Sequence, residues 1–211
     1  MFRPLRLGAL GAVGAAGAVG TVAAVLIDRL LRRRRGAARF PPLRMLVVVD
    51  APIGATWAVV ADVPRQPEWM HDMKSVTFLD PLPLEVGSRA AASVRILGIT
   101  VTDPVVVTEI SPPTRYAIRH EGRFKGDGVI TLEPGATGET TIVRWEETLV
   151  PPLLPDLGAL LQAPILRAVF QTDLARLKVL VERDVARDRH GEWTAPAAAP
   201  ATAHAGPAAT R

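Results

Sequence analysis

The chain has 211 residues, which is room for one domain of ordinary size with extensions but not for two full domains. It contains no cysteine, which excludes disulfide frameworks, thiolate zinc sites and cysteine nucleophiles. The net charge of +4 is unevenly spread: residues 1–44 hold nine arginines and one acid, or +8, and the remaining 16 basic and 20 acidic residues give −4. The high isoelectric point therefore reflects a basic end segment and does not indicate a nucleic-acid-binding domain.

An uncharged segment lies near the start of the chain, at residues 7–27. As a helix it would span roughly 30 Å, enough to cross the hydrocarbon core of a bilayer. The segment ends at Asp28, and a cluster of arginines follows: Arg32, Arg33, Arg34 and Arg35. Such a cluster predicts the cytoplasmic side of a membrane span and can contact anionic lipid head groups. We expect residues 1–35 to be a single-pass anchor in the cell membrane, with the following domain in the cytoplasm.

Three other interpretations of residues 7–27 remain open. A cleaved signal peptide would have a shorter apolar region and a small-residue cleavage site, which an aspartate followed by arginines fits badly. A disordered leader is compatible with the repeated glycines, each of which weakens a helix in water by roughly 1 kcal/mol, although unpaired backbone in lipid costs more. A dimerisation helix is not supported, because glycines at every third position drift around a helix and form no single-faced stripe.

After a linker at residues 36–42, the sequence predicts a strand, one amphipathic helix and a short second helix. Residues 43–50 are rich in β-branched side chains, and Pro52 ends the strand. Residues 53–63 carry apolar residues at helical spacing, and the helix ends before Pro64 because the residue before a proline avoids the α conformation. A further helical turn is expected over residues 66–70.

Six strand candidates with turn residues between them follow. They cover residues 74–79, 88–97, 100–110, 115–121, 125–133 and 140–150. This regular spacing predicts an antiparallel meander. Pro104 falls inside one of the candidates, which suggests an edge position or a β-bulge there.

A long helix is predicted to close the domain. Asp156 can cap its start, and a wide apolar stripe follows. Pro164 should kink or break the helix and leave residues 166–187 as its firm part. Residues 191–211 are rich in alanine and proline, so we expect a disordered tail.

The order of these elements resembles the helix-grip fold of the START-like (SRPBCC) superfamily, in particular its polyketide cyclase/dehydrase and lipid-transport type. The matching stretches are VVVDAPIGATWAVVADVPRQPEWM, EISPPTRYAIRHEG, GDGVITLEP, GETTIVRWEETL and LARLKVLVE. Gly87 also matches a glycine that opens the third strand. The resemblance implies an α+β domain at residues 43–190, in which a curved antiparallel sheet grips the C-terminal helix around an apolar cavity. Members of this type bind lipids, isoprenoids, polyketides or similar hydrophobic molecules, and some catalyse cyclisation or dehydration.

The resemblance leads to a set of candidate residues for the cavity. They are Trp57, Trp69, Met70, Arg119, His120, Trp145, Glu147, Phe170 and Leu174. Trp69 would lie at the cavity mouth or plug the core, and Trp145 would chiefly pack in the core. Strand alternation allows either His120 or the pair Arg119 and Glu121 to face inward. An inward Arg119 paired with Glu147 would give the pocket a polar end.

No catalytic residue, metal site or cofactor is assigned from the sequence. His71 and Asp72 have no recognised ligand spacing and are expected at the surface, and the other histidines are scattered. Nucleophile elbows, phosphate loops and dinucleotide fingerprints do not occur in the sequence.

Three functions are compatible with these observations. The first is a membrane-anchored carrier or sensor of a hydrophobic small molecule. The second is a cyclase or dehydratase whose acid–base groups would come from Arg119, His120 and Glu147. The third is an interaction module with a collapsed cavity.

Overall fold

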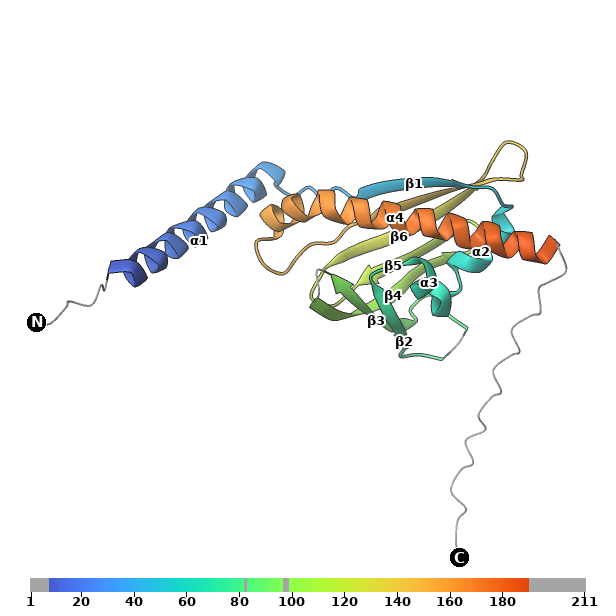
Figure 1. The fold of residues 1–211 in the computed structure, drawn as a ribbon, viewed down its shortest axis with the longest axis horizontal. Coiled ribbons are helices and arrows are strands. Elements are labelled where there is room, and N and C mark those ends of the chain that lie inside the picture. Colours follow the sequence, from blue (N-terminus) through green and yellow to red (C-terminus); the bar gives the residue numbers. More distant parts are fainter. Residues whose placement is uncertain (1–7, 82, 97–98, 190–211) are drawn as a thin grey trace, which may run out of the picture.

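The computed structural model describes residues 8–81, 83–96 and 99–189, with side chains from residue 20 onward except at Ile96 and Ile99. The described elements are a first helix, a strand, three short helical segments, six further strands and a long last helix (Figure 1). Their bounds are α1 Gly8–Arg35, β1 Leu43–Val49, α2 Ile53–Val60, η1 Val63–Arg65, α3 Gln66–Trp69, β2 Met73–Phe78, β3 Arg89–Ile96, β4 Ile99–Ser111, β5 Arg115–His120, β6 Gly126–Pro134, β7 Thr141–Glu147 and α4 Pro155–Arg189.

The strands form one antiparallel sheet in the order β1-β7-β6-β5-β4-β3-β2. Strands β2 to β6 each pair with the next strand along the chain, and β1 pairs with β7. In Figure 1, α4 lies across one face of the sheet and α1 projects away beyond the start of α4. The predicted meander and the α+β helix-grip arrangement are confirmed.

The inner face of the sheet follows from strand alternation. In β7 the buried side chains are Thr141, Val143, Trp145 and Glu147, at every second position. Helix α4 covers this face with a stripe at helical spacing, in which Leu174, Leu177, Leu180 and Val181 are buried. These residues form the main core with β1, β6 and α2. The buried residues of α4 are concentrated in its second half, and only Leu166 joins them from the apolar residues of the first half.

Pro164 was predicted to kink or break the last helix, and the break is wrong, because α4 continues through Pro164. A proline inside a helix removes the hydrogen bond to the carbonyl group four residues earlier, here that of Leu160. Both Leu160 and Pro164 are exposed, so water can reach the carbonyl that has lost its partner. The first half of the helix therefore persists.

The prediction for Pro104 is also wrong, because β4 lies between β3 and β5 and its irregular register falls between Val107 and Glu109. The carbonyl oxygen of Pro104 accepts the N–H of Glu121, so this backbone position faces the β5 side of the strand. Strand β5 ends at His120, and its pairing with β4 ends there too. The missing N–H of Pro104 therefore falls just past the end of β5, where the carbonyl oxygen of Glu121 accepts Nζ of Lys125 instead.

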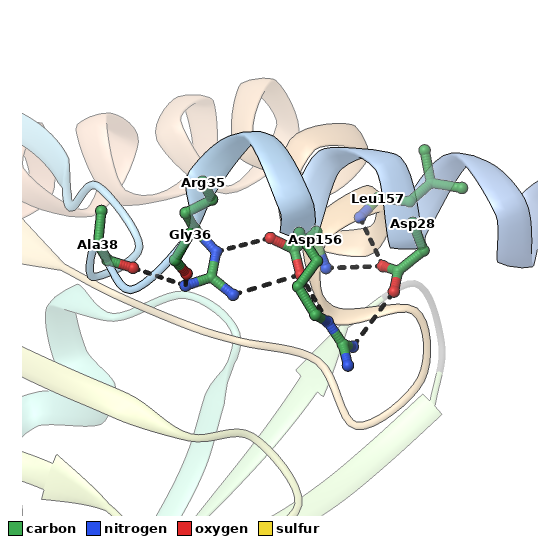
Figure 2. A network of polar contacts seen from close by, with 7 residues as sticks. Asp28, Arg35, Gly36, Ala38, Asp156 and Leu157 are labelled. Atoms are coloured by element: carbon green, nitrogen blue, oxygen red, sulfur yellow. Dashed lines mark hydrogen bonds and ion pairs between the residues drawn. The ribbon is translucent and has the colours of Figure 1, made fainter.

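The start of α4 is capped by a residue of α1 (Figure 2). A carboxylate oxygen of Asp28 accepts the N–H of Asp156 at 2.8 Å and the N–H of Leu157 at 3.0 Å. These are two of the N–H groups that a helix leaves unpaired in its first turn, and the helix dipole favours a negative charge there. Asp156 was predicted to cap this helix itself; instead it lies within the first turn, and Asp28 supplies the acceptor.

The carboxylate of Asp156, in turn, accepts hydrogen bonds from arginines of α1. Nε of Arg35 donates to it at 2.6 Å, and Nε of Arg32 lies 3.5 Å from its other oxygen. Arg32 also lies 3.3 Å from Asp28, so each carboxylate has a guanidinium neighbour. The hydrogen bond from Arg35 lowers the pKa of Asp156 below its ordinary value, against the effect of burial. We call this arrangement of Asp28, Arg32, Arg35 and Asp156 the α1–α4 joint.

The predicted tail, residues 191–211, lies outside the described residues, and so does residue 7 of the predicted membrane span. Within the described part of the chain, no helix combines the length and the apolar character needed to cross a bilayer. The anchor over residues 1–35 stays a prediction.

We expect Asp28→Ala to loosen the start of α4. Loss of a carboxylate cap costs about 0.5–2 kcal/mol, so the amides of Asp156 and Leu157 should exchange hydrogen several-fold faster. Hydrogen exchange followed by mass spectrometry or NMR measures this. Arg29→Ala is the matched control, because Arg29 is the exposed neighbour of Asp28. Equal exchange in the two variants would contradict the capping role.

Candidate functional site

A cavity of about 420 Å³ lies between the inner face of the sheet, α3 and the first half of α4. Its wall is mainly aliphatic and aromatic. The apolar wall residues are Val63, Met70, Met73, Val76, Leu84, Ala90, Ala92, Val94, Val101, Val105, Val107, Tyr116, Ile118, Phe124, Ile130, Trp145, Leu149, Ile165, Leu166, Val169 and Phe170. Pockets of this size and lining typically bind small apolar molecules.

A few polar side chains interrupt this wall. They are Gln66, Asp72, Ser88, Asp103, His120, Glu147, Gln162 and Asp173. Polar groups in an apolar pocket fix the orientation of a ligand, and buried ones need hydrogen-bond partners in the protein. Three of them, Asp103, Glu147 and Asp173, are buried carboxylates, so their partners decide the electrostatics of the cavity.

The best-connected polar group is a buried trio of Trp145, Glu147 and His120. One carboxylate oxygen of Glu147 accepts the indole N–H of Trp145 at 2.9 Å. The other oxygen lies 2.9 Å from Nε2 of His120. Glu147 is only 3% exposed, and these two partners satisfy both of its oxygens.

Strand register brings the trio together. Trp145 and Glu147 are two residues apart on β7 and share its inner face. Gly128 is paired with Glu147 on the neighbouring strand β6. A Cβ atom at position 128 would lie 2.6 Å from a carboxylate oxygen of Glu147, so glycine leaves the space that the carboxylate occupies. His120 reaches the group from the end of β5.

Glu147 raises the pKa of His120 by more than burial lowers it. Burial lowers the pKa of His120, while the hydrogen bond and the charge of Glu147 raise it, with smaller contributions from Asp103 and Asp127. The net pKa of His120 lies above its ordinary value of 6.5. Because this pKa is raised in the folded state, the pair stabilises the fold below pH 6.5 and loses that contribution as the pH rises through the raised pKa.

A second polar position in the wall is Asp173, on the apolar face of α4. One of its oxygens accepts the backbone N–H of His71 at 2.9 Å. Burial and, to a smaller extent, the neighbouring charge of Asp72 raise the pKa of Asp173 to about 6, against the lowering effect of the hydrogen bond from His71. This carboxyl group takes up a proton at mildly acidic pH.

Five of the nine candidate residues line the cavity: Met70, His120, Trp145, Glu147 and Phe170. The ring of Trp145 lies 4.7 Å from that of Phe170, so the two aromatics form one patch of the wall. The alternative of an inward His120 agrees with the structure. Arg119 is exposed and pairs with Asp127 at 3.4 Å, so the alternative of an inward Arg119 paired with Glu147 is wrong.

The other three candidates belong to the core. Trp69 and Leu174 have no exposed surface, and Trp57 is half-buried against both apolar clusters. Of the two alternatives for Trp69, the core position holds and the cavity mouth is wrong, because its ring packs edge-on against Trp145 at 6.0 Å and does not line the cavity. Its indole nitrogen is buried without a hydrogen-bond partner among the described residues.

Sequence reasoning missed Asp103, Asp173 and Gln162 as wall residues, and placed Asp72 at the surface. A signal was present for two of them. Asp173 interrupts an apolar helical stripe, lying three residues after Phe170 and four before Leu177, and Asp103 alternates with Val101 and Val105 on one strand face. A charged residue on a predicted core face indicates a special environment. Among the described residues, no group of three or more His, Asp or Glu side chains could hold a metal ion.

Solved structures share this fold. A protein from Thermus thermophilus has a TM-score of 0.58 at 17% identity, covering 68% of this chain and 99% of its own. The Zhui aromatase/cyclase from a Streptomyces species has a TM-score of 0.54 at 18% identity, covering 68% of this chain and 94% of its own. A START superfamily protein from Mycobacterium smegmatis has a TM-score of 0.51 at 16% identity, covering 70% of this chain and 99% of its own.

The sequence comparisons are of two kinds. No curated protein matches the chain. The sequence model of a protein family, described as polyketide cyclase / dehydrase and lipid transport, matches residues 43–182. This match runs from β1 to the buried second half of α4 and includes every strand of the sheet. The chain therefore belongs to the polyketide cyclase/dehydrase and lipid transport family.

Proposed function

We propose that this protein binds a hydrophobic small molecule in its cavity and acts as a carrier or sensor of that molecule. The observation that supports the proposal most directly is the volume of about 420 Å³ within an apolar wall. Such a space argues against the interaction module, which would need a collapsed cavity. Fold alone does not give function, so the proposal depends on this cavity and not on the family.

The polar trio suggests what the ligand carries at one end. Nε2 of His120 is committed to Glu147, which leaves Nδ1 as the ring atom through which His120 can bind a ligand. With its raised pKa the ring tends to be protonated, and Nδ1 then donates a hydrogen bond. We infer a ligand with an apolar body and one oxygen acceptor, such as a lipid, an isoprenoid or a polyketide-like molecule.

Filling the cavity tests this proposal. Ala92 lines the cavity on β3, so Ala92→Phe should weaken binding of the fluorescent probe phenylnaphthylamine at least about tenfold, or about 1.4 kcal/mol. Titration of the probe measures the affinity, and mass spectrometry of an organic extract should show less co-purified lipid.

The matched control is Ala91→Phe, one residue earlier on the same strand, where the side chain lies on the other face of the sheet. Its affinity for the probe should be close to that of the wild type. Equal affinity in all three proteins, or no binding by the wild type, would count against the ligand-binding function.

We also propose that residues 7–27 anchor the chain in the cell membrane, with the domain in the cytoplasm. The uncharged length of this segment and the arginines that follow it support the proposal. Of those arginines, Arg32, Arg33 and Arg34 are exposed, and Arg32 and Arg35 also pair with Asp156. Arg33 and Arg34 are thus available to lipid head groups, and Arg32 and Arg35 contribute to the α1–α4 joint.

An integral anchor should resist extraction. When membranes of cells that express the full chain are washed with alkaline carbonate or concentrated salt, the protein should stay in the pellet, because burial of the apolar segment does not depend on charge. The chain with Leu26→Arg and Val22→Arg should be released more readily. Complete release of the wild-type chain by salt alone would contradict the anchor.

The second candidate is an enzyme of the cyclase or dehydratase kind. One observation favours it: His120 pairs with a buried carboxylate and lines the cavity, as a general acid–base residue requires. The carboxylate would hold the imidazole in one orientation and sustain its protonated form, so that Nδ1 could deliver a proton to an oxygen of the substrate.

The candidate depends on the tuning of His120 by Glu147. In Glu147→Gln, only the smaller effects of Asp103 and Asp127 still offset burial, so the pKa of His120 should fall. NMR titration of the ring protons measures it. Asp127→Asn is the control, since the exposed Asp127 contributes less and should lower this pKa only slightly. An unchanged pKa in Glu147→Gln would remove the physical basis of the enzyme candidate.

A further inference from the structure

Exposed apolar side chains gather at the end of the molecule that holds the α1–α4 joint. At the start of α4, Leu160 is 59% exposed and Leu161 64%, and Leu153, just before the helix, is 81% exposed. On α1, Leu26 and Leu30 flank Asp28 in sequence and are also about half exposed or more, at 58% and 50%. Clusters of large exposed apolar residues mark surfaces that contact a protein, a ligand or a membrane.

The charges beside these residues favour an anionic partner. Both carboxylates of the joint, Asp28 and Asp156, are buried and have arginine neighbours, so they present little negative charge to the outside. Arg29, Arg33 and Arg34 are exposed on the same helix, α1. A surface that combines exposed leucines with arginines matches the interfacial region of a bilayer that contains anionic lipids.

This end of the molecule also adjoins the cavity. Ile165 lines the cavity and is 50% exposed, so the inner wall and the outer apolar surface meet at one residue of α4. Leu161 lies one helical turn before Ile165 and therefore on the same side of the helix. The joint holds this part of α4 beside the C-terminal end of α1 (Figure 2).

We propose that the first turns of α4 lie in the head-group region of an anionic bilayer, and that the ligand passes between this bilayer and the cavity beside Ile165. The passage of ligand rests on the ligand-binding function proposed above, whereas the contact of α4 with the bilayer does not. An apolar molecule that takes this route need not cross water. The joint holds the start of α4 beside the end of α1, so that both reach the membrane surface together.

The chain has no cysteine, so a single introduced thiol can report on one position. Leu161→Cys carries a nitrobenzoxadiazole label at the proposed contact. Val179→Cys is the matched control, because Val179 is an apolar residue on the same helix that is 66% exposed but lies in its second half. Both full-length proteins are reconstituted into vesicles of phosphatidylcholine with and without phosphatidylglycerol.

In the anionic vesicles the label at position 161 should shift to shorter wavelength and be quenched several-fold less by aqueous iodide than the label at position 179. Three results would overturn the proposal. They are equal quenching at the two positions, equal protection of position 161 in neutral and anionic vesicles, and protection that rises with the protein-to-lipid ratio, which would indicate contact with a second copy.

The route of the ligand is tested by a double variant, Leu160→Ser with Leu161→Ser. Neither residue lines the cavity, so affinity for phenylnaphthylamine should stay at the wild-type value. Transfer of a pyrene-labelled phospholipid from anionic vesicles to the protein should slow several-fold. An unchanged transfer rate would overturn the route. If the wild type binds neither probe, the ligand-binding function fails, whereas protection of the label at position 161 would still support the membrane contact.

Discussion

Helix α4 has to close the hydrophobic core and cover the cavity at the same time, and this double demand explains much of the architecture. Its second half packs Leu174, Leu177 and Leu180 into the sheet with almost no exposed surface. Its first half lies over open space, where it cannot gain the same packing. That half needs support from elsewhere, and the joint with α1 supplies it. Asp28 caps the end of α4 that the core does not hold.

The wall of the cavity also has two parts with different roles. Apolar side chains form most of the wall, and the buried carboxylate of Glu147 is satisfied within the protein by Trp145 and His120. Because both oxygens have partners, the carboxylate needs no ligand to offset its burial. One donor of the histidine is left for a guest molecule. A pocket with an internally balanced polar end can bind its ligand and release it, which suits a carrier and also a reaction with a single proton-transfer group.

Much of this fold could be predicted from the sequence, because it depends on local signals. Alternating apolar residues and turn residues located the six strands after α3 to within a few positions, and the apolar stripe located the buried half of α4. Alternation also put Trp145 and Glu147 on one face of β7, but it did not decide that this face is the inner one. The choice between Arg119 and His120 depended on how β5 pairs with its neighbouring strands. The sequence of a single strand does not give that pairing.

The remaining features depend on contacts between distant parts of the chain. Asp28 and Asp156 are 128 residues apart, and no local pattern links a residue near the end of one helix to the start of another. Asp156 has the sequence signature of a cap, so its pairing with arginines of α1 could not be anticipated. The choice for Trp69 between the cavity mouth and the core stayed open, because it depends on how α3 packs against Trp145 and α4. A break at Pro164 was among the predictions because the sequence does not show whether the unpaired carbonyl group is exposed to water.

The length of α4 has a mechanical consequence. With a rise of about 1.5 Å per residue, a continuous helix from Pro155 to Arg189 is a rod roughly 50 Å long. Its far part is clamped in the core, so a guest that pushes the near part outward tilts the rod about that clamp and stretches the bonds to Asp28 and Arg35. Such a coupling is reciprocal. If binding of the guest weakens the joint by a given free energy, breaking the joint strengthens binding of the guest by the same amount. A guest that moved the first half of α4 would therefore also change how firmly the joint holds α1.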